Sequence, residues 1–391
     1  MNKAILDPEV QEFITANEKA DLTRLILSGS PFEHITAQEI AQQIFGKKKA
    51  KIKLPEWYEN AVFYPPKINL EQCSSSATAR LKSTFVKGKS LIDLTGGFGV
   101  DDYFFSQQFS EVTYCEINPE LYEITQHNLQ RLGAKNITFH QGDGMQYIAQ
   151  GEKNYDVIYL DPSRRNDSKG KVFILAYCEP NLPENLDLLL SKAKNILVKA
   201  SPILDISNAL NELDHVKKVI IVALNNEVKE LLFLINKEDA ELSIETYNIT
   251  NSEVEELHLN YTEASLANAR FELPQAYLYE PNAALMKSGM FNAIGNAFIL
   301  NKLHQNSHLY TSESLIEFPG RRFKVSEVVP FSAKAISKKL KQQKANITTR
   351  NFKQSVYQLR KKYKVKDGGD LYVFFTTDMN NASVVLFCEK V

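Results

Sequence analysis

The sequence is poor in cysteine and contains no long hydrophobic run. Its four cysteines are scattered without a Cys-x-x-Cys pair, a pattern that excludes a disulfide framework and the usual spacing of zinc ligands, so we expect reduced thiols and no metal site. Nowhere do about 18 apolar residues follow one another, and the first residues lack the apolar core of a secretion signal. These absences predict a cytoplasmic protein without a membrane partner.

A strong net charge is also lacking, since 46 basic and 47 acidic residues give a formal charge of −1. The average hides a basic segment, because residues 318–366 contain Glu327 as their only acidic residue. A solvated surface normally mixes both signs, so this bias predicts contact with a polyanion such as RNA, although a lysine-rich surface can also serve solubility alone. The basic residues of the segment are Arg321, Arg322, Lys324, Lys334, Lys338, Lys339, Lys341, Lys344, Arg350, Lys353, Arg360, Lys361, Lys362, Lys364 and Lys366.

The length of 391 residues is long for a single domain and predicts several units with separate cores. Apolar residues at helical spacing predict a small helical module over residues 1–70. Residues 71–240 alternate between strand and helix patterns, as in an open, mostly parallel α/β sheet. We expect a linker and a small domain over residues 241–320, and a small basic α+β domain over residues 321–391.

Seven strand candidates run through the alternating segment, and the last two are separated by a polar stretch too short for a helix. They predict a seven-stranded sheet whose last strand is antiparallel, which is the shape of a class I methyltransferase. The usual dinucleotide-binding fold has six parallel strands and fits less well. The expected strands are 91–94, 112–115, 137–140, 155–160, 195–199, 218–223 and 230–235, a further one is expected at 242–247, and the expected helices are 100–109, 119–132, 182–193 and 206–213.

The first strand of this sheet runs directly into a glycine turn. Asp93 lies near its end, and Thr95, Gly96, Gly97 and Gly99 form the turn. Glycines are needed here because the chain must bend sharply and let a cofactor approach the backbone without a Cβ in the way. These residues are therefore candidate ligands of a nucleotide-like cofactor.

Acidic residues follow the next two strands. Glu116 ends the second strand, where a carboxylate can accept both hydrogen bonds of a ribose diol. Asp143 and Gly144 follow the third strand, where a carboxylate or its neighbours can meet an adenine ring. A tight turn without a ligand would also suit these glycine-flanked positions.

The fourth and fifth strands end in residues suited to the methyl acceptor. Asp161 and Pro162 can present a carboxylate and a carbonyl as acceptors to a target amine. Arg164 and Arg165 can bind a phosphate of the substrate, although an Asp-capped turn with solvent-exposed arginines is an alternative.

The end of the fifth strand brings Lys199 and Ser201 to the same sheet edge as candidate substrate ligands, because ligands of open α/β sheets bind at the carboxyl ends of the strands. Residues 71–80, which precede the first strand, are rich in small hydroxyl side chains. This segment either closes over the methionine end of a cofactor or caps a helix.

A basic run at residues 47–53 is followed by Trp57, the only tryptophan. Positive charge beside an aromatic ring suits contact with RNA. Equally, the run can be a linker whose Trp57 packs on the next domain. Upstream, Thr36 and Glu39 have the spacing of a capping box at the start of a helix.

Taken in order, the segments 93–99, 116–119, 142–145 and 161–164 resemble the successive motifs of S-adenosylmethionine-dependent class I methyltransferases, with Thr95 where the first glycine of the turn usually stands. More narrowly, the chain is similar to bacterial methyltransferases that carry a ferredoxin-like insert and a C-terminal THUMP-like domain. The resemblance implies S-adenosylmethionine as cofactor and RNA as substrate. The stretches that carry the narrower likeness are residues 71–75, 279–283, 307–311 and 318–321.

The motif after the fourth strand does not by itself decide which atom of the acceptor is methylated. Methyltransferases of exocyclic amines usually have a second proline and an aromatic residue where Ser163 and Arg164 stand, whereas Asp-Pro-x-Arg resembles uridine C5 methyltransferases. The latter need a cysteine nucleophile near the following strand end, where this chain has Ser201. A serine adds poorly to a base at neutral pH, so we predict direct transfer to a base nitrogen of RNA. A methyltransferase of proteins or small molecules, and an inactive RNA-binding protein with this fold, are the alternatives.

Overall fold

The computed structural model describes residues 1–164, 174–340 and 343–391. Two compact units make up the chain. The first consists of residues Met1–Lys218 and Lys229–Ala240, and the second of Val219–Val228 and Glu241–Val391. Within the described residues, every helix is too short or too polar to cross a membrane.

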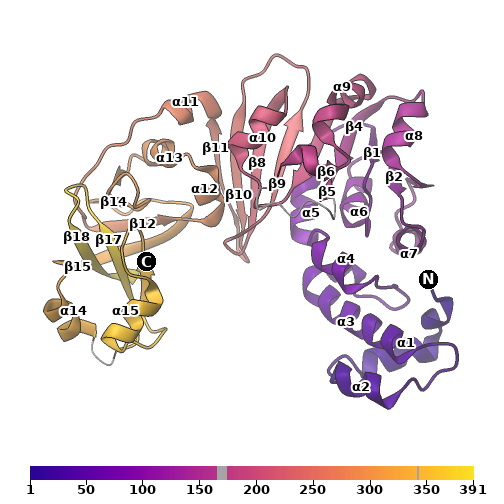
Figure 1. The fold of residues 1–391 in the computed structure, drawn as a ribbon, viewed down its shortest axis with the longest axis horizontal. Coiled ribbons are helices and arrows are strands. Elements are labelled where there is room, and N and C mark those ends of the chain that lie inside the picture. Colours follow the sequence, from indigo (N-terminus) through magenta and orange to yellow (C-terminus); the bar gives the residue numbers. More distant parts are fainter. Residues whose placement is uncertain (165–173, 341–342) are drawn as a thin grey trace. The chain divides into compact units, whose positions relative to one another are not determined.

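The first unit begins with a group of helices (Figure 1). Thr36 forms the predicted capping box, because its hydroxyl accepts a hydrogen bond from Glu39 N–H and the Glu39 side chain accepts one from Thr36 N–H. The elements are η1 (Lys3–Leu6), α1 (Pro8–Ala16), α2 (Leu22–Ser28), α3 (Ala37–Lys53), η2 (Pro55–Trp57), α4 (Lys67–Gln72) and α5 (Ser76–Ser83).

Trp57 connects these helices to the glycine turn. Its indole is fully buried, 5.0 Å from the ring of Tyr103 and 6.1 Å from that of Phe98. Part of the basic run is used internally as well, since Lys47 is buried and donates to Thr15 Oγ1. Of the two interpretations of this segment, the structure shows the one in which Trp57 packs on the next part of the chain.

The central sheet contains all seven predicted strands and has the order β11-β10-β8-β9-β7-β4-β1-β2-β3. The pairs β2/β3, β1/β2, β1/β4 and β4/β7 are parallel, and β7/β9 is antiparallel, as predicted for the last strand of the set. The seven strands are β1 (Ser90–Asp93), β2 (Glu111–Glu116), β3 (Ile137–Gln141), β4 (Tyr155–Leu160), β7 (Ala193–Ala200), β8 (Val216–Leu224) and β9 (Glu227–Ile235).

Helices connect the parallel strands near the predicted positions. Asp143 caps α8, a short helix that does not appear among the expected elements. The connecting elements are α6 (Val100–Ser106), α7 (Pro119–Arg131), α8 (Gly144–Gln150), β5 (Ser163–Arg164), η3 (Leu175–Tyr177), β6 (Cys178–Glu179), α9 (Leu182–Lys192) and α10 (Ile206–Glu212).

Two strands extend the sheet beyond the seven. The further strand expected at residues 242–247 is present as β10 (Ser243–Ile249). It pairs with an antiparallel neighbour, β11 (Val254–Asn260), which was not predicted from the sequence. The nine-stranded sheet therefore contains the class I methyltransferase arrangement with an added hairpin.

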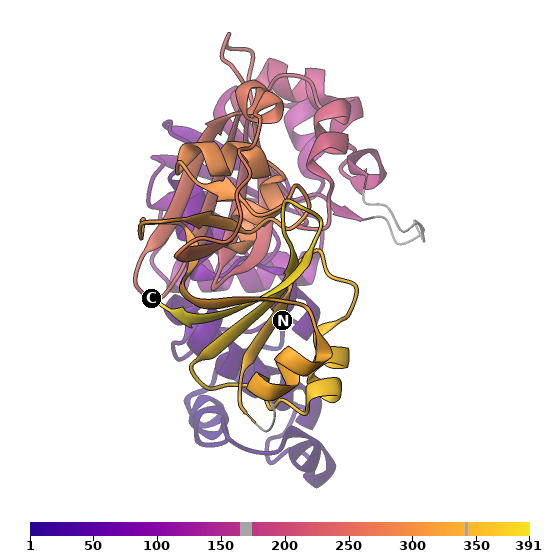
Figure 2. The same ribbon diagram turned by 90° about the vertical axis from the view of Figure 1, so that its left-hand side faces the viewer.

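The second unit contains a sheet of its own, with the order β13-β14-β12-β15-β18-β17-β16. Alternate residues of β17 face opposite cores, because Val373 and Phe375 pack with α14 and α15 while Phe374 packs with Leu278 and Leu309. Figure 2 shows α14 and α15 together beside the strands of this sheet. The elements are α11 (Tyr261–Leu266), β12 (Tyr277–Pro281), α12 (Ala283–Ser288), α13 (Phe291–Ala297), β13 (Asn301–Lys302), β14 (Tyr310–Ser312), β15 (Gly320–Pro330), α14 (Ala333–Leu340), β16 (Asn346–Thr349), α15 (Val356–Tyr363), β17 (Leu371–Thr377) and β18 (Ser383–Lys390).

Candidate active site

The glycine turn is organised by a buried carboxyl group. Asp93 is 2% exposed, and its Oδ1 accepts hydrogen bonds from the backbone N–H (2.7 Å) and the hydroxyl (3.1 Å) of Thr95. Burial raises the pKa of Asp93 to about 7, against these hydrogen bonds, which lower it. The geometry gives Asp93 a role in shaping the turn, and its predicted contact with a cofactor stays a prediction.

The glycines of the site are required for different reasons. A Cβ on Gly96 would lie 2.1 Å from the ring of Tyr114, and one on Gly144 would lie 2.5 Å from the backbone that follows β1. Gly99 has a φ of +69°, which favours glycine. Gly97 also has a positive φ, and a Cβ there would meet no atom closer than 3.7 Å. Gly97 is therefore the turn residue with open space beside its backbone.

Glu116 is held at the end of β2 next to this turn. Its Oε2 accepts a hydrogen bond from Gly97 N–H (2.9 Å), and its Oε1 accepts one from Asn118 N–H (2.7 Å). A carboxylate oxygen has a second lone pair, so both oxygens can still accept from a diol. The carboxylate of Glu116, which is predicted to bind the ribose, is thus fixed in orientation before any cofactor binds.

Asp143 is tied to the start of α8. Its Oδ1 accepts hydrogen bonds from Met145 N–H (2.8 Å) and Gln146 N–H (3.3 Å), which makes it the N-cap of the helix. Both bonds use the same oxygen. The capping role that the glycine-flanked turn suggested is present, and it leaves Oδ2 for the predicted contact with adenine.

Asp161 follows β4 and is tied to the glycine turn. Its backbone N–H donates to Thr95 Oγ1 (2.7 Å), and its Oδ2 forms an ion pair with Lys199 Nζ at 2.5 Å. The Asp161 side chain is 39% exposed, whereas that of Lys199 is 11% exposed. Pro162 is buried directly after it. The carboxylate is therefore open to a substrate on one side and held by a lysine on the other.

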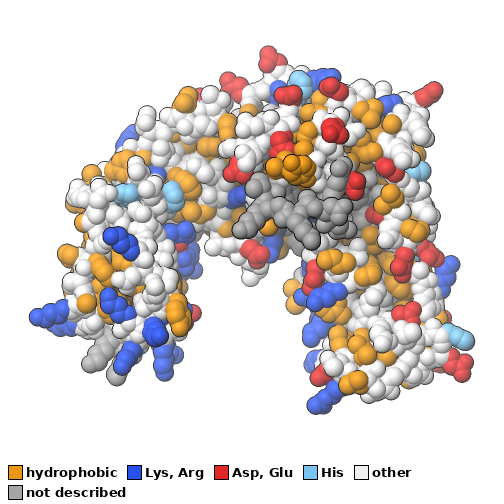
Figure 3. All heavy atoms as spheres, in the orientation of Figure 1, with side chains coloured by type: hydrophobic (Ala, Val, Ile, Leu, Met, Phe, Trp, Pro, Cys, Tyr) orange, Lys and Arg blue, Asp and Glu red, His pale blue; other side chains and the backbone are white. Residues whose placement is uncertain are grey.

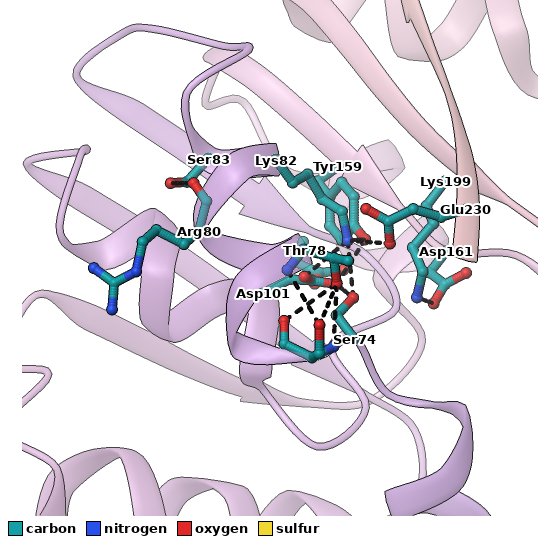
Figure 4. Close-up of polar contacts among 12 residues, drawn as sticks. Ser74, Thr78, Arg80, Lys82, Ser83, Asp101, Tyr159, Asp161, Lys199 and Glu230 are labelled. Carbon is teal, nitrogen blue, oxygen red and sulfur yellow. Dashed lines mark hydrogen bonds and ion pairs between the residues drawn. The ribbon is translucent and has the colours of Figure 1, made fainter. Parts of the chain in front are cut away.

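A buried cluster of charges lies beside this pair (Figure 4). The fully buried Lys82 donates to Ser74 Oγ (2.9 Å) and Asp101 Oδ1 (2.8 Å), and lies 3.1 Å from Glu230 Oε2. The hydroxyl of Tyr159 donates to Asp101 Oδ2 (2.8 Å). The cluster joins α5, α6, β4 and β9 around one ammonium group. None of its four ionisable residues is among the site residues predicted from the sequence.

Burial and opposite charges set the protonation of these groups. Burial by itself would lower the pKa of Lys199, but the carboxylates of Asp161, Asp101 and Glu230 outweigh it and raise that pKa. For Asp101, burial acts to raise the pKa, and the ammonium groups of Lys82 and Lys199 lower it overall. Lys199 is therefore a cation and Asp101 an anion at neutral pH.

A second carboxyl group, that of Asp102, is buried next to Asp93. Burial first, and the neighbouring charge of Asp93 second, raise the pKa of Asp102 well above its usual value. Both oxygens of this carboxyl group are buried without a hydrogen-bond partner among the described residues, which suits a protonated, neutral Asp102 beside Asp93.

For the remaining predicted residues, the structure describes fewer contacts. Ser201 Oγ accepts from Ile203 N–H (3.3 Å) in the turn after β7. The backbone of Arg164 pairs with Cys178 in the β5–β6 ribbon, and Arg165 lies outside the described residues. In the segment before β1, Ser75 caps α5 and Ser74 joins the buried cluster, so the helix-capping interpretation is the one that the structure shows for Ser75.

Three family models match the chain. Residues 54–166 match a model of protein-L-isoaspartate(D-aspartate) O-methyltransferase, residues 277–319 a ferredoxin-like domain, and residues 320–390 a THUMP domain-like model. A comparison with curated proteins finds no match.

One solved structure is similar to the whole chain, and others are similar to part of it. A crystal structure from Porphyromonas gingivalis W83, described as that of a candidate methyltransferase, is 31% identical, covers 100% of this chain and 98% of its own, and has a TM-score of 0.89. An rRNA methylase from Streptococcus thermophilus is 14% identical over 41% of this chain and 96% of its own, with a TM-score of 0.31. A candidate methyltransferase from Streptococcus mutans in complex with SAH is 15% identical over 40% of this chain and 94% of its own, with a TM-score of 0.29.

The sheet order, the glycine turn and the match to the Porphyromonas gingivalis structure define a class I methyltransferase. More narrowly, the chain belongs to the family of methyltransferases that carry a ferredoxin-like domain and a C-terminal THUMP-like domain. The recognition made from the sequence motifs and the predicted fold class are both confirmed.

Proposed function

We propose that this protein transfers a methyl group from S-adenosylmethionine directly to a base nitrogen of RNA. The observation that carries the proposal is the position of Asp161, a partly exposed carboxylate whose own backbone is hydrogen-bonded to the glycine turn through Thr95. That bond sets the acceptor-binding group beside the turn at which class I methyltransferases bind their cofactor.

The residues at the glycine turn fit S-adenosylmethionine. Gly97 leaves open space beside the backbone, and the two oxygens of the fixed Glu116 carboxylate each keep a lone pair that could accept from a ribose diol. Asp143 and Gly144 would contact the adenine ring. Thr95, Gly96 and Gly99 shape the turn. When bound, the cofactor supplies a methyl group that is already activated on a sulfonium, so positioning can provide most of the catalysis.

Asp161 orients the acceptor in this proposal. Lys199 occupies its Oδ2, so Oδ1 accepts a hydrogen bond from the N–H of the target base, and the carbonyl of Pro162 is a second acceptor. A nitrogen that receives the methyl group would be left with a surplus proton. Asp161 accepts this proton and passes it to water.

The protonation state of the Cys73 thiol favours direct transfer over a covalent mechanism. Cys73 lies within electrostatic reach of Lys199, but burial raises its pKa despite the nearby ammonium groups of Lys53 and Lys199. A protonated thiol is a poor nucleophile. Neither Cys73 nor Ser201 therefore suits the addition to a base that C5 methylation requires.

The RNA part of the proposal is supported by the basic THUMP-like region. Figure 3 shows Lys and Arg side chains gathered over α14 and α15. Arg164, Arg165 and Ser201 stay candidates for contacts with the RNA near the acceptor. We also keep the domain bounds 1–70, 71–240, 241–320 and 321–391 as part of the proposal.

The test begins with calorimetry of the full chain with S-adenosylmethionine and with NAD. We expect micromolar binding of the first and none of the second. Radioactive methyl transfer to RNA from cells that lack the protein then tests the substrate, followed by mass spectrometry of the labelled nucleoside. Asp161→Asn is expected to bind the cofactor normally and to lose transfer at least about a hundredfold. Labelled protein instead of RNA, or a methyl group on a base carbon, would contradict the proposal.

A further inference from the structure

We propose that Lys199 is a positioning residue, which holds one oxygen of Asp161 so that the other faces the methyl acceptor. The inference rests on the proposed function, because it gives Lys199 a role through Asp161 in the transfer step. It differs from the sequence-based expectation that Lys199 binds substrate itself.

The exposure of the two partners is the first argument. In the ion pair, the side chain of Asp161 is more than three times as exposed as that of Lys199 (39% against 11%). A substrate that approaches the carboxyl ends of the strands therefore meets the carboxylate before it meets the ammonium. Lys199 Nζ reaches Asp161 Oδ2 from β7, the strand that pairs with β4.

The second argument is the charge that surrounds Lys199. Its neighbours include the carboxylates of Asp101 and Glu230 in addition to Asp161, and Figure 4 shows Glu230 and Asp161 near Lys199. Glu230 is 2% exposed, and its Oε1 accepts no hydrogen bond from the described part of the chain. An ammonium group among buried carboxylates stays charged, so Lys199 does not take the proton of the acceptor. It can act only as a fixed cation.

The third argument is the link from this cation to the rest of the fold. Glu230 is paired with Lys82, which also holds Asp101 at the start of the helix after the glycine turn. Ion pairs therefore join Asp101 and Glu230 to Lys82, and the carboxylate of Glu230 also acts electrostatically on Lys199, which is paired with Asp161. Because the inner members are buried, the outermost carboxylate is held by a rigid support and is preorganised for the acceptor.

The experiment is a double-mutant cycle between Lys199→Met and Asp161→Asn in the full chain. Methyl transfer to RNA from cells that lack the protein gives kcat and KM, and calorimetry gives the affinity for S-adenosylmethionine. We expect Lys199→Met to lower kcat at least about tenfold, with KM for RNA and cofactor affinity unchanged within about twofold. In the Asp161→Asn background the same change should have no further effect on kcat.

Two further variants separate positioning from a general loss of structure. Lys199→Arg keeps the cation and should retain kcat within about threefold of the wild type. Lys194→Met is the matched control, because Lys194 lies on the same strand and pairs with Asp156 at the opposite end, where it is 78% exposed. It should leave kcat unchanged. A higher KM at unchanged kcat, or additive losses in the cycle, would overturn the inference in favour of direct contact with RNA.

The same cycle measured by urea unfolding needs no substrate. If the wild type transfers no methyl group to RNA, the proposed function fails, and the unfolding cycle still reports on Lys199. If the double variant unfolds at the same urea concentration as the less stable single variant, the two side chains are coupled, and the inference that Lys199 holds Asp161 stands. If the losses of the two single variants add up in the double variant, the side chains do not hold each other. The inference then fails with or without RNA activity.

Discussion

The acidic residues at the carboxyl ends of β2, β3 and β4 are each held by a different kind of partner. Glu116 accepts from the backbone N–H of Gly97 in the glycine turn and from that of Asn118, Asp143 caps α8, and Asp161 is paired with Lys199. Each partner leaves part of the carboxylate unoccupied. The three residues can therefore bind a ligand without first reorganising, which lowers the conformational cost of binding.

Glu116 offers a direct test at the residue scale. Glu116→Gln keeps the size of the side chain but removes the charge and one acceptor for the ribose diol, so we expect the affinity for S-adenosylmethionine to fall about tenfold or more. Calorimetry measures the change. Glu111→Gln is the control, because Glu111 begins the same strand at its other end and is exposed. Equal affinity of wild type and Glu116→Gln would remove Glu116 from the cofactor site.

At the scale of secondary-structure elements, Lys82 joins α5 to α6 and β9 through one buried ammonium. Lys82→Met would leave the carboxylates of Asp101 and Glu230 buried without their cation, so we expect the free energy of unfolding to fall by about 3–5 kcal/mol. Urea unfolding measures this loss. Lys153→Met breaks the exposed pair with Glu111 and should cost less than about 1 kcal/mol. Similar losses in the two variants would argue against a structural role of the buried cluster.

The start of β4 carries a pH-dependent contact. Asp156 accepts from the side chain of Lys194 and from the backbone of Lys89 and Ser90, and these bonds lower its pKa to about 2 from 3.8. Because the lowered pKa belongs to the folded state, the carboxylate stabilises the protein above about pH 4, and this contribution is lost as the pH falls toward 2.

We therefore expect Asp156→Asn to be less stable than the wild type at about pH 6, with a difference that shrinks toward about pH 3. Urea unfolding at several pH values gives both quantities. Asp214→Asn, a change at an exposed carboxylate, is the control. A difference that stays constant with pH would mean that Asp156 contributes through shape and not through its charge.

At the scale of the whole molecule, the neutral average charge coexists with a basic C-terminal region. If α14 and α15 bind RNA, each lysine that neutralises a phosphate contributes about 0.7–0.9 to the slope of log affinity against log salt concentration. Changing the exposed Lys334, Lys338 and Lys361 to Gln should then weaken binding and reduce that slope by about 2 to 3.

The matched control changes three exposed lysines of the first unit, Lys87, Lys89 and Lys135, to Gln. Fluorescence anisotropy with labelled RNA at several salt concentrations measures both variants. We expect the control to bind as the wild type does. An unchanged slope in the α14 and α15 variant would favour the view that its lysines serve solubility.

Much of the fold could be predicted because its signals are local. Thr36 and Glu39 are only three residues apart, and the buried run at Tyr155–Leu160 matches β4 at both ends. β11 was missed because a strand recruited to the edge of a sheet needs little hydrophobic patterning of its own, and Val254–Asn260 has no buried residue.

By itself, the sequence determined the alternating α/β order, the glycine turn, the carboxylates at the strand ends and the family, since each rests on residues close together in the chain or on motifs in a characteristic order. Only the tertiary structure decided which buried charges meet. Asp101 and Tyr159 are 58 residues apart, and Lys199 and Asp161 are 38 apart, yet each pair is in contact. No local pattern marks such partners, because a buried charge is stabilised by whichever element the fold brings beside it.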